Sequence, residues 1–215
     1  MRPLSNFEWV ALARSEDEGR PMLMGVHVQG DQLVATDGHP LHIAPRDGCG
    51  LPDGTWDVAS LAPVDLGGKF PTWEQAIPEG QPKRLITDVR TVRSHCKGAI
   101  AAGYEHYVSL PTEDGERMVL DASYLRQALA GAKNGEGKWE WVEVFAGGPY
   151  EPLKILIPGF RIAVVMPAKP AELLEGSERP FPRSLLIPQL DVFIEPLPAA
   201  EPAPVGEQVS EGVPS

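Results

Sequence analysis

Asp37, His39 and His42 are side chains of the kind that bind a catalytic metal ion, and they stand within six consecutive positions. A carboxylate and two imidazoles are common ligands of Zn²⁺, which activates a bound water for hydrolysis. We expect the first two on a tight turn and the third in a strand, and no other Cys, His or carboxylate cluster completes the shell. A Gly-rich phosphate loop and a Gly-x-Ser-x-Gly elbow are also absent from the sequence. A metal-dependent hydrolase is therefore a remote alternative, and we predict a protein that is not an enzyme and has no metal or cofactor.

The last 45 residues differ in composition from the rest of the chain. Residues 171–215 hold eight prolines, eight acidic residues and two basic residues, and so carry −6 of the net charge of −11. Such a segment cannot bury enough apolar surface to offset its ordering entropy, which predicts a flexible Pro/Glu-rich tail. Within it, residues 185–194 form an apolar island. Such an island is typical of a short recognition motif, and a strand that packs back on the body is the alternative.

The remaining residues have the composition of a globular body. The chain is 42% hydrophobic, which is enough for one good core or two small ones. A net charge of −11 argues against a simple nucleic-acid coat, although the body carries only −5 of it and a local basic face could still meet DNA. Cys49 and Cys96 stand far apart and favour free thiols in a reducing compartment. No apolar run is long enough to span a bilayer and no secretory signal is present, so we predict a cytoplasmic protein without membrane contact.

A helix followed by several strands occurs repeatedly along the body. The alternation of apolar residues and the Gly, Pro and Asp turns predict the elements listed here: helices over 7–14 (capped by Asn6), about 85–97 and 121–133, and strands over 22–28, 32–36, 41–44, 104–110, 118–120, 139–145, 153–157 and 160–166. Nothing in this order demands a parallel sheet. We therefore predict an α+β protein of antiparallel sheets with helices on one face.

Four stretches of the body resemble one protein family. The stretch 35–41, Ala-Thr-Asp-Gly-His-Pro-Leu, resembles the Ala-Thr-Asp-Gly-His-Arg-Leu signature of the bacterial sliding clamp, the β subunit of DNA polymerase III. The stretch 70–78 resembles that family's Phe-Pro-Asp-Tyr…Ile-Pro segment. The stretch 119–129 resembles the helix that opens the family's last half-domain, and the stretch 164–167 resembles its terminal Val-Met-Pro. The four occur in the family's order over residues 5–169 and match its second and third domains. This implies a DNA-clamp-like fold with an abbreviated clamp-like domain over 1–80, a clamp-like domain over 81–170 and the tail over 171–215.

The resemblance also implies an apolar pocket that receives peptides from DNA polymerases and repair proteins. Carried over by position, its residues would be Leu23, Thr36, Gly38, His39, Leu41, Pro71, Ala76, Val164, Met166 and Pro167. Pro40 replaces the family's Arg, which removes one hydrogen-bonding wall. Residues 47–69 are too few for a complete half-domain, and nothing matches the family's first domain. The sequence therefore does not decide whether copies of the chain form a closed homo-oligomeric ring. The reduced size and altered pocket suggest a phage or mobile-element origin.

Basic residues are spaced as a DNA-facing surface would require. Arg90, Arg93 and Lys97 are three and four apart on a predicted helix, Lys83 and Arg84 precede it, and Arg126 and Lys133 share a face of a later helix. Such stripes contact phosphates of double-stranded DNA without reading sequence. The alternative interpretation is an ordinary solvated helix face.

The tail holds Gln189, Leu190, Asp191, Val192 and Phe193, which resemble the Gln-Leu-(Ser/Asp)-Leu-Phe motif that partners insert into the clamp pocket. Leu190 and Phe193 would be the apolar anchors, and Gln189 would fix the register. The target would be this chain's own pocket, a neighbouring subunit or a separate clamp. The leading hypothesis is a sliding-clamp-like processivity factor of DNA replication or repair. The alternative is an adaptor or inhibitor that captures a separate full-size clamp through its tail.

Overall fold

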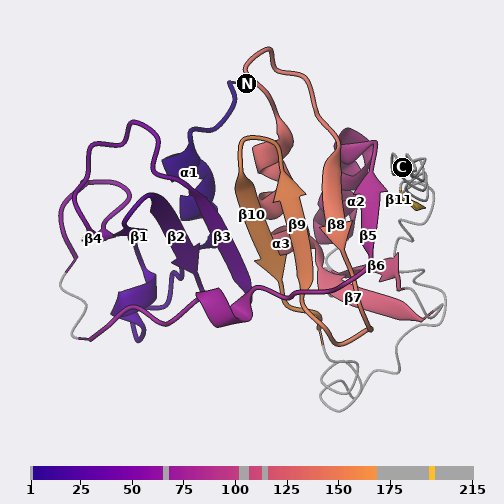
Figure 1. Cartoon of the computed structure of the whole chain (residues 1–215), viewed down its shortest axis with the longest axis horizontal. Helices are drawn as coiled ribbons and strands as arrows, with labels where there is room; N and C mark the ends of the chain where they lie inside the picture. The colour runs from indigo at the N-terminus through magenta and orange to yellow at the C-terminus, as the bar shows by residue number, and fades with distance from the viewer. Residues whose placement is uncertain (1, 65–67, 102–106, 113–115, 169–193, 197–215) are drawn as a thin grey trace, which may run out of the picture.

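A single long antiparallel sheet dominates the structure, a computed structural model that describes residues 2–64, 68–101, 107–112, 116–168 and 194–196. The nine strands lie in the order β11-β5-β8-β9-β10-β3-β2-β1-β4 (Figure 1), and β6 pairs with β7 in a separate two-stranded sheet. The strands are β1 (Val26–Gln29), β2 (Gln32–Thr36), β3 (Pro40–Pro45), β4 (Gly54–Trp56), β5 (Lys83–Ile86), β6 (Tyr107–Pro111), β7 (Arg117–Asp121), β8 (Val142–Phe145), β9 (Leu153–Ile157), β10 (Arg161–Val165) and β11 (Ile194–Pro196).

Three α-helices, α1 (Asn6–Val10), α2 (Val89–Ala101) and α3 (Ala122–Ala128), pack on one face of the long sheet and lie behind it in Figure 1. Four short 3₁₀ helices accompany them in the described residues: η1 (Ala11–Ala13), η2 (Pro21–Leu23), η3 (Glu74–Ala76) and η4 (Leu129–Ala132). The predicted α+β class with helices on one face is confirmed.

Helix ends follow local capping chemistry, with one correction. Ser5, and not Asn6, caps α1: its hydroxyl accepts from the Glu8 N–H while the Glu8 carboxylate accepts from the Ser5 N–H. Asn6 is instead the first helical residue, and its amide donates to the Pro45 carbonyl at 2.9 Å. Asp121 caps α3 as predicted, because its carboxylate accepts from the Ser123 N–H at 2.7 Å.

A second correction concerns the helix predicted over about 85–97. Residues 83–86 form β5, which pairs with β8 and places Leu85 opposite Glu143. The helix begins only at Val89, where the Asp88 carboxylate accepts from the Thr91 N–H at 3.0 Å. Leu85 fits the apolar spacing of that helix, but pairing with β8 buries Ile86 and so favours a strand.

The two faces of the sheet bury different apolar clusters, because side chains alternate along a strand. The larger cluster lies between the sheet and the helices and includes Leu33, Ala35, Leu125 and Val165. A smaller cluster lies on the opposite face and consists of Val34, Leu41, Ile43, Trp73 and Val164, with Phe70, Ile77 and Ile162 packed against it. The helix-free face of the sheet therefore has an apolar area of its own, and Trp73 covers part of it.

The sheet runs without a break across the domain boundary predicted at residue 80. Strand β3, from the first predicted domain, pairs with β10 from the second, and the larger cluster draws residues from both. The boundary at residue 80 stays a prediction.

One part of the predicted tail is described. Ile194–Pro196 forms β11, which pairs with β5; of the apolar island over 185–194, only Ile194 lies within the described residues. The pentapeptide over 189–193 lies outside the described residues. The adaptor hypothesis therefore rests on the sequence alone. In the described part of the chain, no helix combines the length and the apolar character needed to cross a membrane.

Candidate functional site

Three stretches that are distant in sequence meet over the central strands of the long sheet, near the start of β3 and the end of β10. Leu41 on β3 lies opposite Val164 on β10, and just beyond the strand ends the Met166 N–H donates to the His39 carbonyl at 3.0 Å. Leu41 is 5% exposed and Val164 is 1% exposed, and both belong to the smaller cluster with Trp73. The strand ladder thus brings residues near 39–41 and 164–166 together, and Trp73 belongs to the same buried cluster.

The stretch 70–77 packs against the smaller cluster, and both of its predicted pocket residues are exposed. The Phe70 ring stacks on the His27 imidazole, with centroids 4.4 Å apart, and Trp73 is 7% exposed. Pro71 and Ala76 are exposed. This segment therefore forms one wall of the site, held by Phe70 and Trp73.

The turn between β2 and β3 forms a second wall and is fixed by hydrogen bonds of its own. The Thr36 hydroxyl donates to the Pro40 carbonyl at 2.7 Å and accepts from the Gly38 N–H at 3.0 Å, while the Asp37 carboxylate accepts from the His39 N–H at 2.8 Å. Gly38 has φ of 103°, a conformation that favours glycine, and its exposed backbone is open to close approach.

Arg20 and Tyr124 support this turn from other elements. The Arg20 guanidinium donates to the Asp37 carbonyl at 2.6 Å, and the His39 ring stacks on Tyr124 of α3 with centroids 5.9 Å apart. Burial, together with the nearby Asp37 carboxylate, raises the pKa of the Tyr124 hydroxyl to about 12, so the phenol stays protonated at neutral pH. Neither residue was among the predicted pocket residues. Their only signal in the sequence, a long side chain with a polar end, is too common to single them out.

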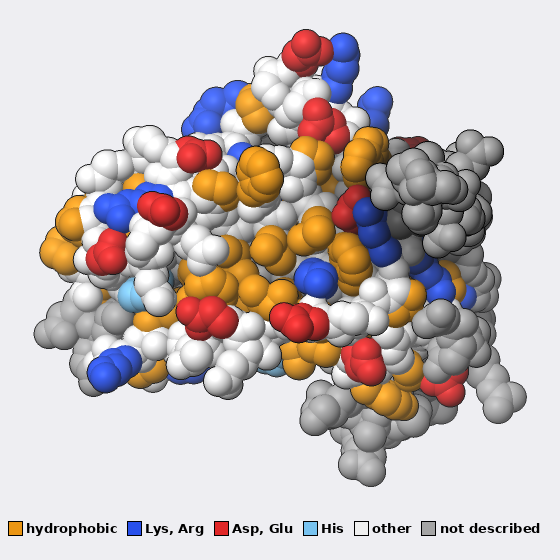
Figure 2. Space-filling view, viewed as in Figure 1, with side chains coloured by type: hydrophobic (Ala, Val, Ile, Leu, Met, Phe, Trp, Pro, Cys, Tyr) orange, Lys and Arg blue, Asp and Glu red, His pale blue; other side chains and the backbone are white. Residues whose placement is uncertain are grey.

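The ten predicted pocket residues divide into three groups. Leu41 and Val164 form a buried apolar floor. Gly38, His39, Pro71, Ala76 and Met166 are exposed around it, Met166 at 40%, while Thr36 and Pro167 are half-buried. Leu23 is buried in η2 and belongs to neither apolar cluster. Hydrophobic side chains gather across the middle of this face of the molecule, over the central strands (Figure 2).

A buried apolar cluster beside an exposed methionine and a few polar groups has the composition that a small peptide site requires. The thioether of Met166 is flexible enough to adapt to different side chains. Pro40, at the position where the family has Arg, is buried and lies opposite Val165 in the ladder. Its N–H is missing because of the ring, and it offers no side-chain hydrogen bond to a ligand.

The seven predicted DNA-contacting residues do not form one stripe. Lys83 and Arg84 lie on β5: the Lys83 ammonium forms an ion pair with Glu143, and the Arg84 guanidinium donates to the Pro111 carbonyl at 2.7 Å. Arg90 and Lys97 are exposed on α2. Arg93 instead lies half-buried over the Trp139 ring, 4.5 Å from its centroid.

The position of Arg93 affects its charge. Burial, followed by repulsion from Arg126, lowers the pKa of the Arg93 guanidinium to about 10, so it is still charged at neutral pH. Arg126 and Lys133 are half-buried, and the Lys133 ammonium lies 5.9 Å from the Trp139 ring centroid. Arg90 and Lys97 are therefore the members of the predicted set that α2 presents directly to solvent.

The structure does not bring Asp37, His39 and His42 together as a metal site. His42 is fully buried, its ring stacks on Trp9, and its Nδ1 donates to the Trp9 carbonyl at 3.0 Å. Asp37 and His39 lie at the exposed turn, and no three His, Cys, Asp or Glu residues of the described chain are grouped so as to hold a metal ion. Strand geometry explains the outcome, because His42 points to the helix-covered side of β3.

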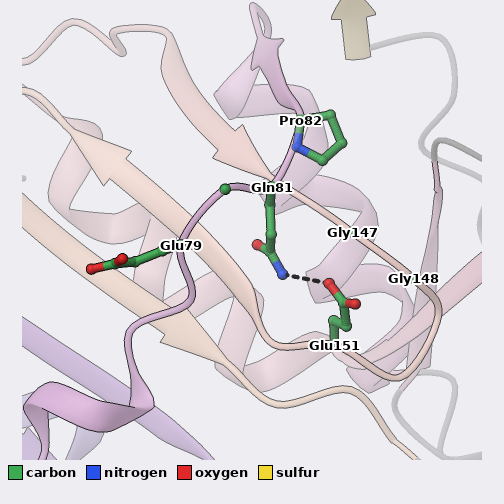
Figure 3. Close-up of a pocket in the computed structure, with 7 residues that line it drawn as sticks. Glu79, Gln81, Pro82, Gly147, Gly148 and Glu151 are labelled. Carbon is green, nitrogen blue, oxygen red and sulfur yellow. Dashed lines mark hydrogen bonds between the residues drawn. The ribbon is translucent and has the colours of Figure 1, made fainter.

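A hollow of about 550 Å³ lies between residues 79–82 and the loop that joins β8 to β9. The Gln81 amide donates to the Glu151 carboxylate at 3.0 Å, whereas Glu79 points away from both (Figure 3). A Cβ at Gly147 would lie 1.8 Å from a Glu151 oxygen, so a larger residue there would displace this flexible carboxylate. The two carboxylates do not converge, and this hollow has no donor set for a cation.

Comparison with known proteins gives clear matches to solved structures and none by sequence. No protein-family model matches the sequence, and no curated protein matches it. Among solved structures, the C. crescentus β sliding clamp superposes with a TM-score of 0.56 and 18% identity over 78% of this chain and 65% of that one. The DNA polymerase III β subunit of Thermotoga maritima gives a TM-score of 0.57 and 18% identity over 76% of this chain and 62% of that one. The β subunit of DNA polymerase from Streptococcus pyogenes gives a TM-score of 0.59 and 15% identity over 76% of this chain and 62% of that one.

The chain therefore spans just under two thirds of the length of these three solved clamps, at 62–65%. At this level of identity the likeness is one of fold. The family resemblance of the four short stretches agrees with this similarity of fold, since the structural match extends over about three quarters of the chain. The protein described here has the fold of the bacterial DNA polymerase III β sliding clamps.

Proposed function

We propose that this chain is a sliding-clamp-like factor of DNA replication or repair, which docks partner peptides and contacts double-stranded DNA without reading its sequence. The observation that carries the proposal is the buried cluster that contains Leu41, Trp73 and Val164 on the helix-free face of the central strands, with the exposed Met166 directly after β10. The clamp-like fold supports it, because the solved structures of that fold are described as sliding clamps and polymerase subunits.

The chemistry of the site favours an extended peptide with apolar side chains. The floor of Leu41 and Val164 is already dry, so a ligand side chain that covers it would gain mainly by burying the exposed part of Met166 and neighbouring apolar atoms. Gly38 carries no side chain that would keep a peptide backbone away. The partners we propose are polymerase or repair proteins that carry clamp-binding peptides.

The DNA contact we propose lies on the helix-covered side of the sheet. Arg90 and Lys97 are exposed on α2, away from the face that holds the peptide site. Two exposed cations on one helix give weak, salt-dependent affinity for phosphates and no base reading. The two surfaces therefore leave room for a peptide and DNA at the same time. Ring formation, a cytoplasmic location and a phage origin remain predictions from the sequence.

Peptide docking can be tested with a labelled peptide that contains Gln-Leu-Asp-Leu-Phe. Met166→Asp places a charge over the apolar floor, and we expect it to weaken peptide binding by roughly tenfold or more in fluorescence anisotropy. The matched control is Phe160→Asp, at the opposite end of β10, where the side chain is 90% exposed. This variant carries the same new charge and should bind as the wild type does. Equal affinities for the two variants, or no binding to the wild type, would overturn the proposed peptide site.

A further inference from the structure

The strand at the β5 edge comes from the C-terminal part of the chain. Ile194 lies opposite Ile86, Glu195 opposite Leu85 and Pro196 opposite Arg84, in antiparallel register. On its other side β5 pairs with β8. Without residues 194–196, β5 would be the last strand of the sheet, with a row of N–H and C=O groups facing outward.

The opposite edge of the sheet is covered in a similar way. Beside β4, Pro63 forms a bridge with Trp56, and the Val64 N–H donates to the Thr55 carbonyl at 2.8 Å. Each end of the long sheet is thus covered by a short segment that contains a proline. Proline cannot donate to the next strand, so such a segment ends the ladder instead of extending it. The shared arrangement indicates that both edges are protected against an added strand.

The cover on β5 is short enough to be removed. It pairs over three residues, and Pro196 has no N–H to contribute. Each hydrogen bond of this kind adds little net stability, because the released groups bond to water. We propose that residues 194–196 form a removable cap on the β5 edge, which prevents that edge from pairing with the β5 edge of a second copy of this chain.

The β5 edge suits a twofold partner. Two antiparallel copies of β5 can pair about a twofold axis with Leu85 opposite Leu85 and Arg84 opposite Ile86. In that register no two positive side chains lie directly opposite each other, and like charges would be the main obstacle. Such a contact has the self-complementary form of a twofold dimer. The inference concerns the sheet edge and is independent of the proposed peptide site.

The test uses the full chain and two double variants. Ile194→Pro with Glu195→Pro removes the N–H groups of both residues, one of which faces β5, whereas Ile194→Ala with Glu195→Ala changes the same side chains and keeps both N–H groups. Hydrogen exchange followed by NMR reads the four β5 amides individually. Alternate amides of a strand point to opposite neighbours, so two point to β8 and two to the cap. The amides that point to β8 are the internal control for a native fold.

We expect the two outward amides to exchange roughly tenfold faster in the proline variant than in the wild type or the alanine variant. Light scattering should show the mass of the proline variant rising with concentration beyond that of the other two. A peptide of residues 192–199 should reverse the rise, and the same peptide with both prolines should not. Equal outward-amide exchange in all three proteins overturns the cap. Faster exchange without added mass at any concentration overturns the blocked dimer.

Discussion

The imidazole of His42 lies flat against the indole of Trp9, with ring centroids 4.4 Å and planes 5° apart. The acceptor of its Nδ1–H is a carbonyl oxygen, so the proton must be on Nδ1, and Nε2 has no hydrogen-bond partner among the described residues. Burial lowers the pKa of His42 to about 4, and the imidazole is therefore neutral in the folded protein at pH 7. This contact ties α1 to β3, the strand that leads from the turn of the candidate site.

The His42–Trp9 contact predicts that the protein loses stability in mild acid. The unfolded chain takes up a proton at His42 near pH 6.5, whereas the folded chain does so only near pH 4. The contribution of His42 to the free energy of unfolding should thus fall by up to about 3 kcal/mol as the pH drops through this window, and this contribution levels off below it. Urea unfolding at a series of pH values measures the fall.

His42→Phe and His42→Gln both remove the titration, the first with a ring that can stack on Trp9 and the second without one. Both variants should show a flatter dependence on pH than the wild type, with Gln less stable throughout. His27, whose pKa is also lowered by burial, would leave a smaller slope in both. A variant curve that runs parallel to the wild-type curve would show that His42 is not the group that titrates.

Gly131 is predicted to be essential for packing around Trp9. A Cβ at Gly131 would lie 2.7 Å from Nε1 of Trp9, the atom that donates to the Ala128 carbonyl at 2.9 Å. Gly131→Ala should therefore push the indole from its place and lower the free energy of unfolding by about 2–4 kcal/mol. The control is Gly135→Ala, where a Cβ would meet nothing within 4 Å and the change should stay within about 0.5 kcal/mol. Similar losses for the two variants would refute this account of the packing.

The proposed DNA contact predicts a salt-dependent effect of charge reversal on α2. Arg90→Glu with Lys97→Glu should weaken binding to a duplex of any sequence and reduce the slope of log affinity against log salt by about 2, one for each lost phosphate contact. Electrophoretic mobility shifts or anisotropy at several salt concentrations give this slope.

The control for this experiment is Lys69→Glu with Lys138→Glu, two exposed cations outside α2 that give the same change in net charge. The control should keep the wild-type slope, because its positions are not in the proposed contact. Equal slopes for the two double variants would mean that net charge, and not α2, governs the affinity.

Several elements could be predicted from the sequence because their causes are local. The strands over 32–36 and 153–157 match the structure residue for residue, since apolar alternation and flanking turn residues fix both their type and their ends. Asp121 was identified as a cap because a short carboxylate before a helical pattern can accept from the first free N–H groups.

Other elements depended on partners far away in the chain. Leu85 stands four before Val89 and fits a helical face, yet β8 draws residues 83–86 into the sheet. Arg93 continues the basic spacing of Arg90 and Lys97, yet Trp139, from a later loop, takes its guanidinium onto the ring face. Arg20 and Tyr124 support the candidate site from separate elements, and no pattern within either segment predicts that they meet at Asp37.

The sequence by itself determined the local turns, most of the strands and the α+β class, and through four short stretches it indicated the clamp-like fold. Only the tertiary structure decided that Leu41 lies opposite Val164, that Trp73 joins them in one buried cluster, and that residues 194–196 add to the edge of β5. The physical reason is the range of the interactions. Turn and cap conformations follow from steric and hydrogen-bonding preferences of a few consecutive residues, whereas strand order follows from burying apolar faces that are brought together only when the whole sheet forms.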